Sequence, residues 1–167
     1  MRFGKRRDDD GPADDGRDAF LGLRAQVLGL DPSLIGADPA ASVVWGALME
    51  MGIETAVATI VALADGSTSL YTSTGGGVIG GGEHASVVAE NRGFLDTIER
   101  NLERFVPDDA DELPTHGTVT FRALTHRGRL SATAAEAELG AGTHPLSEVF
   151  FAGHRVITAL RLIASPP

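Results

Sequence analysis

The chain has 167 residues, of which 43 % are hydrophobic and 22 % charged, and it carries a formal net charge of −9 and no cysteine. This length supports one domain with a substantial core. The lack of cysteine excludes disulfides, thiolate nucleophiles and cysteine-ligated metals. The acidic balance argues against a nucleic acid partner, which would require a basic face.

The first part of the chain differs in composition from the rest. Residues 1–17 mix both signs of charge with glycine and proline and contain almost nothing to bury. This composition predicts a disordered tail, followed by a single α+β domain over residues 18–167.

No apolar stretch follows the basic residues of the tail, as a secretory signal would require. No apolar run is long enough to cross a bilayer. We therefore expect a cytoplasmic protein without a membrane partner.

Apolar residues at helical spacing predict two helices at the start of the domain. The first begins at Asp18, which is a suitable N-cap, and ends near residues 29–32. The second begins at Pro39, and Gly52 is the natural residue to follow its C-terminus. Its apolar stripe would consist of Val43, Val44, Ala47, Leu48 and Met51.

Two hairpins are predicted from alternating residues and turn signals. Residues 54–64 form the strongest strand pattern, and neither of its faces is polar, so both faces should be covered in the folded protein. The Asp-Gly pair at 65–66 is a strong hairpin signal, and the returning strand covers residues 67–74. The second hairpin joins strands at residues 118–125 and 129–138.

Two more helices are predicted on either side of the second hairpin. One covers residues 84–105, and the other begins at Pro145. The apolar stripe of the last helix is wider than one buried face needs, which leaves room for a partner surface. Taken together, the elements predict an α+β fold, in which a mostly antiparallel sheet built from two hairpins has helices packed on it.

The order of the elements suggests a fold group. Helix, hairpin, helix, hairpin and helix follow one another over residues 39–164, and this order resembles the profilin-like group of folds, and within it the roadblock family. The resemblance is one of topology, so it assigns no functional residue to this chain. It implies a small dimerising scaffold or regulator rather than an enzyme.

A glycine-rich stretch between the first hairpin and the helix at 84–105 is the main candidate for function. Six of the eight residues from 75 to 82 are glycine. Glycine carries an entropic cost that a chain accepts where the backbone needs positive φ or where another group must approach closely. A ligand is therefore expected at this loop if one binds. The candidate residues are Gly75, Gly76, Gly77, Gly80, Gly81, Gly82, Glu83 and His84.

Three interpretations of this loop can be compared. Gly75, Gly77 and Gly80 match the spacing of a dinucleotide-binding fingerprint, but the preceding strand is the second arm of a hairpin and not the first strand of a βαβ unit. A loop that binds an anion or small ligand through backbone N–H groups is the second interpretation, although Glu83 places negative charge beside it. The third and preferred interpretation is a structural crossover that lets the helix pack closely. His84 is the best candidate for a titrating group.

These observations favour a non-catalytic, cytoplasmic protein-interaction or regulatory module that forms a homodimer and has a protein partner. The alternative is a small-ligand or anion-binding domain, or a small enzyme, that uses the loop at 75–84. No serine stands in a Gly-x-Ser-x-Gly elbow, and no two histidines have the i, i+4 spacing of metal ligands. We therefore predict no catalytic residue, no metal site and no cofactor.

Overall fold

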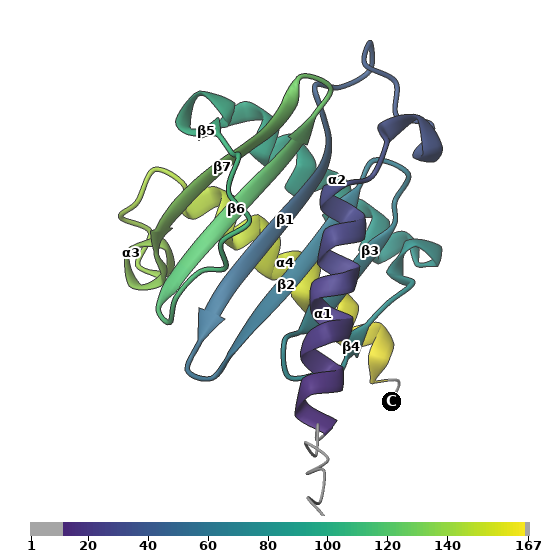
Figure 1. Ribbon diagram of the computed structural model, residues 1–167. Coiled ribbons are helices and arrows are strands. Elements are labelled where there is room, and N and C mark those ends of the chain that lie inside the picture. Colours follow the sequence, from purple (N-terminus) through teal and green to yellow (C-terminus); the bar gives the residue numbers. More distant parts are fainter. Residues whose placement is uncertain (1–11, 166–167) are drawn as a thin grey trace, which may run out of the picture.

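The computed structural model describes residues 12–165, and over these residues the chain forms a seven-stranded antiparallel sheet with helices on both faces (Figure 1). The strand order is β4-β3-β2-β1-β6-β7-β5. The strands are β1 (Val44–Ile53), β2 (Ala56–Leu63), β3 (Thr68–Thr72), β4 (Gly77–Val78), β5 (Val106–Pro107), β6 (Thr118–Thr125) and β7 (Gly128–Ala135). The predicted α+β class, with helices packed on a mostly antiparallel sheet, is confirmed.

Helices α2 and α4 cover one face of the sheet, and α1 crosses the other face (Figure 1). The α-helices are α1 (Pro12–Leu28), α2 (Ala85–Arg100), α3 (Glu136–Gly140) and α4 (Ser147–Ala164). Short 3₁₀ segments are η1 (Pro32–Ile35), η2 (Gly81–Glu83) and η3 (Leu102–Arg104). In the described part of the chain, no helix combines the length and the apolar character needed to pass through a bilayer.

Helix α1 begins earlier than the sequence pattern indicated. The structure describes it from Pro12 onward, before the predicted start at Asp18. The early turns contact the turn between β3 and β4, since a methyl group at Gly16 would lie 3.2 Å from the Thr74 carbonyl oxygen. Residues 12–17 are therefore helical where a disordered tail was predicted. The remainder of that predicted tail, residues 1–11, lies outside the described residues.

The predicted helix that begins at Pro39 is wrong, because this segment contains β1, the central strand of the sheet. Every residue from Val44 to Gly52 is buried, with α2 and α4 on one face and α1 on the other. A strand buried on both faces reads as a continuous apolar run, in which helical spacing also occurs. Gly52 does not end a helix. A methyl group there would lie 2.0 Å from the Thr115 carbonyl oxygen, so the loop before β6 packs directly against β1.

Both predicted hairpins are confirmed. β2 and β3 are joined through residues 65–66, where Gly66 has a φ of +92°, and β6 has the predicted bounds. β7 ends sooner than the predicted strand at 129–138, because residues 136–140 form α3. The predicted helix at 84–105 is α2 followed by η3.

Apolar side chains are buried on both faces of the sheet, and β2 shows this most clearly. Ile60 and Ala62 belong to the core under α2 and α4, whereas Val57 and Val61 belong to the core under α1. Phe20 of α1 is a fully enclosed member of the second core and packs edge-on against the ring of Tyr71 at a centroid distance of 5.6 Å. Both apolar faces of β2 are thus covered within one chain, so this strand gives no independent reason to expect a second copy.

Candidate functional site

The first three glycines of the candidate loop form the turn from β3 into the edge strand β4. Residues 75–77 have φ values of +95°, +85° and +150°, a region that glycine enters without the steric cost of a Cβ atom. The Gly75 N–H group donates to the Thr72 carbonyl oxygen at 3.0 Å. A methyl group at Gly77 would lie 2.2 Å from the Leu70 carbonyl oxygen. Turn geometry and close strand packing therefore explain these glycines.

The next glycines lie where the chain enters α2. Gly81 is buried, and a methyl group there would lie 2.5 Å from a terminal methyl of Leu160 on α4. A methyl group at Gly82 would lie 2.8 Å from the Gly66 carbonyl oxygen. Gly80 is different, because it has a φ of +86° and open space around it. Gly81 and Gly82 thus pack against α4 and the β2–β3 turn, whereas the side of the loop formed by Ile79, Gly80 and Glu83 is exposed.

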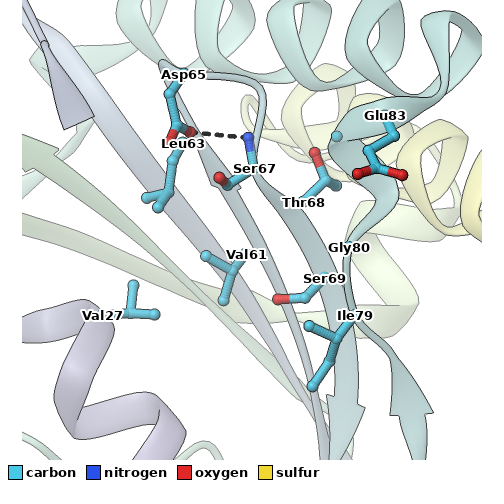
Figure 2. A pocket seen from close by; sticks show the side chains of 11 residues that line it. Val27, Val61, Leu63, Asp65, Ser67, Thr68, Ser69, Ile79, Gly80 and Glu83 are labelled. Atoms are coloured by element: carbon cyan, nitrogen blue, oxygen red, sulfur yellow. Dashed lines mark hydrogen bonds between the residues drawn. The ribbon is translucent and has the colours of Figure 1, made fainter.

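A groove of about 600 Å³ opens on that exposed side, on the face of the sheet that carries α1 (Figure 2). Its walls come from the end of α1, from β2 and β3 with their connecting turn, and from the segment after β4. It is lined by Val27, Val61, Leu63, Asp65, Ser67, Thr68, Ser69, Ile79, Gly80, Gly82 and Glu83. Three predicted site residues line this groove, namely Gly80, Gly82 and Glu83. Gly75, Gly76, Gly77, Gly81 and His84 do not.

The groove has an acidic character. Asp65 and Glu83 contribute carboxylates, and of the described residues that line the groove none is lysine, arginine or histidine. The Asp65 Oδ1 atom accepts a hydrogen bond from the Ser67 N–H group at 2.8 Å, which holds the β2–β3 turn (Figure 2). His84 is exposed at the start of α2 and forms no side-chain capping bond. The two carboxylates oppose the binding of an anion here.

A buried ion network lies on the same face of the sheet, and sequence analysis did not identify it. Glu50 of β1 is fully buried. Its Oε1 atom accepts from Nε of Arg24 on α1 at 2.6 Å, and its Oε2 atom accepts from Nε of Arg122 on β6 at 2.8 Å. Arg122 also pairs with Asp108. Nothing in the local sequence links these residues, because the two arginines stand 26 and 72 positions from Glu50.

The two arginines of this network also hold the acidic loop before β6 against the sheet. Arg24 donates to the carbonyl oxygen of Asp111 at 3.1 Å. Arg122 donates to the carbonyl oxygens of Ala110 at 3.0 Å and Glu112 at 2.6 Å. Every charged group of the network has a partner, as buried charges require. We therefore assign the network to the stability of the fold and to the placement of α1.

Two buried hydroxyls beside the network, those of Thr59 on β2 and Tyr71 on β3, have no partner among the described residues. The Tyr71 side chain on β3 is 5 % exposed, and its hydroxyl forms no hydrogen bond. Burial, and secondarily the nearby Glu50 carboxylate, raises the pKa of Tyr71 to about 12. The hydroxyl therefore stays protonated at neutral pH, and Tyr71 serves as a core residue that packs against α1.

Within residues 12–165 there is no cluster of three or more histidine, aspartate or glutamate side chains suited to hold a metal ion. The comparisons add no functional information: no family model, no curated protein and no solved structure matches this chain. The order of elements behind the resemblance to the roadblock family began with a helix at Pro39, where the structure has β1, so the resemblance stays an untested prediction.

Proposed function

We propose that this chain is a non-catalytic protein-interaction or regulatory module, and that it binds a segment of a partner protein in the groove. The observation that supports this proposal is the groove itself, whose partly apolar lining includes the 70 % exposed side chain of Ile79. An exposed apolar surface with a polar rim is typical of protein interaction sites. The proposal places the module in the cytoplasm. It includes neither nucleic acid nor a membrane among the partners, because the net charge of −9 repels anionic surfaces.

The alternative function, a small-ligand or anion site at the loop, has less support. Ligand sites enclose roughly 70–90 % of the surface of the molecule they bind, whereas this groove is open to solvent along one side. Gly77 already pairs with Tyr71 in the sheet, Gly81 is buried under α4, and neither residue lines the groove. Asp65 and Glu83 oppose an anion in the remaining space.

Photo-crosslinking in cells tests the groove as a protein-binding surface. With p-benzoylphenylalanine in place of Ile79, irradiation is expected to give covalent adducts with another protein, because this exposed side chain lines the groove. Immunoblotting quantifies the adducts, and mass spectrometry identifies the crosslinked protein. The matched control is Leu34, which is 77 % exposed on η1 and does not line the groove. Equal adducts from both positions, or none from either, would contradict the proposal.

The proposed module is a homodimer, and the outer face of α4 is the surface that supports this part of the proposal. Phe151 is 42 % exposed and Leu162 is 70 % exposed, and the two lie on the side of α4 that faces away from the sheet. Sedimentation is expected to give a dimer at micromolar concentration, since apolar side chains exposed on one helix face are readily buried by a two-fold contact.

A double variant, Phe151→Glu with Leu162→Glu, is expected to convert that dimer to a monomer, because each added carboxylate would be buried without a partner. Leu34→Glu is the control, since it changes an exposed leucine elsewhere on the surface and should leave the dimer intact. A wild-type chain that sediments as a monomer at tens of micromolar would remove the homodimer from the proposal.

A further inference from the structure

The base of the groove is apolar and comes from three separate elements. Val61 and Leu63 project from β2, Val27 comes from α1, and Ile79 follows β4 (Figure 2). Val61 and Leu63 are nearly fully buried by α1 and the sheet, whereas the Ile79 side chain is largely exposed. An aliphatic side chain placed against this base would cover Ile79 and gain about 25 cal/mol for each Å² of apolar surface removed from water.

The polar groups of the groove differ in whether they have partners, as Thr68 and the two carboxylates show. Thr68 is already satisfied, because its hydroxyl accepts from Asn91 at 2.7 Å and donates to the Gly66 carbonyl oxygen at 2.8 Å. The carboxylates of Asp65 and Glu83 are different, since among the described residues neither forms an ion pair. The groove therefore presents two unpaired negative charges next to an apolar base.

We propose that the groove selects a partner segment that presents an aliphatic side chain beside a lysine or arginine. This inference rests on the proposed function, to which it adds the chemistry of the partner. The aliphatic side chain packs against Ile79 and Val61, and the cation pairs with Asp65 or Glu83. An acidic segment is rejected, because like charges would face each other in the groove.

Fluorescence anisotropy with a labelled nonapeptide of alternating leucine and lysine tests this inference. Two further peptides replace every lysine by glutamate or every leucine by serine. The protein variant carries Asp65→Asn and Glu83→Gln together, and asparagine keeps the Oδ1 acceptor of the turn hydrogen bond to Ser67. The matched control carries Glu54→Gln and Asp96→Asn, which remove the same charge at exposed positions outside the groove.

The leucine–lysine peptide is expected to bind the wild-type chain and the control variant equally, and to bind the groove variant about fivefold more weakly, as two exposed ion pairs of modest strength imply. The glutamate and serine peptides should not bind. Equal binding of the lysine and glutamate peptides, no binding of any peptide, or an equal loss in the control variant would overturn the inference. If one of these outcomes overturns the inference but photo-crosslinked adducts still form at position 79, the proposed function stands without this partner chemistry.

Two other occupants of the groove are distinguished by a truncated chain in the same assay and by sedimentation. If removal of residues 1–11 strengthens peptide binding severalfold, the chain's own amino-terminal segment occupies the groove, and the inference is overturned. If the peptide dissociates a dimer in sedimentation, the occupant is a second copy of the chain, and the inference is overturned as well.

Discussion

Replacing Glu50 by glutamine is expected to lower the free energy of unfolding by about 3–5 kcal/mol, which is the usual cost of breaking a buried ion pair from one side. Glu50 is fully buried between Arg24 and Arg122, and the side chains of both arginines are nearly inaccessible to solvent. Glutamine has almost the same shape but no charge. The variant therefore leaves two buried guanidinium groups with the single carboxylate of Asp108.

Urea unfolding followed by circular dichroism measures this change. The control is Glu54→Gln, an exposed position in the turn between β1 and β2, where a change within about 0.5 kcal/mol is expected. A double-mutant cycle with Arg24→Gln should show strong coupling, so that the double variant costs less than the sum of the single variants. A Glu50→Gln protein as stable as the Glu54→Gln control would show that the network is not important for stability.

Replacing Gly77 by alanine is expected to lower the free energy of unfolding by about 2–3 kcal/mol, at the upper end of the range for a strained backbone position. The added methyl group would meet both the Leu70 carbonyl oxygen at 2.2 Å and the Tyr71 Cα atom at 2.7 Å. Both are backbone atoms, so β3 or β4 must move to make room. The φ of +150° adds to the cost, because alanine avoids this region.

Two other glycines provide the comparison for Gly77. Gly80→Ala should cost about 1 kcal/mol from its positive φ alone, since nothing lies near the added methyl group. Gly93→Ala should stabilise the protein by about 0.5–1 kcal/mol, because Gly93 lies inside α2 with open space around it. Thermal and urea unfolding of the three variants give the order. If Gly77→Ala lowered the free energy of unfolding no more than Gly80→Ala, this result would contradict the close packing of β4 on β3.

The candidate loop and the groove beside it have separate physical roles. Gly77 and Gly81 allow close contact with neighbouring backbone and side chains, so their function is to bring β4 and α2 against the sheet. Gly80 and Glu83 lie on the other side of the same loop and border the groove. A sequence pattern that marks a glycine-rich loop cannot separate these roles, because it does not show which side of the loop is covered.

Several elements could be predicted because their pattern is local. β6 alternates between two faces and ends at an Arg-Gly turn, and its bounds were predicted correctly. The Asp-Gly turn at 65–66 determined the first hairpin for the same reason, since the turn geometry requires a positive φ at Gly66. α2 and α4 each have one apolar side and one solvated side, which identifies a surface helix without knowledge of its neighbours.

The sequence by itself therefore determined the α+β class, both hairpins and the helices that have a solvated face. Only the tertiary structure decided that residues 44–53 form a central strand, because a segment buried on both faces has no polar side to reveal its period. It also decided that Glu50 meets Arg24 and Arg122, and that α1 and the 79–83 segment border one groove. These features depend on contacts between residues far apart in the chain, which local spacing and propensity do not encode.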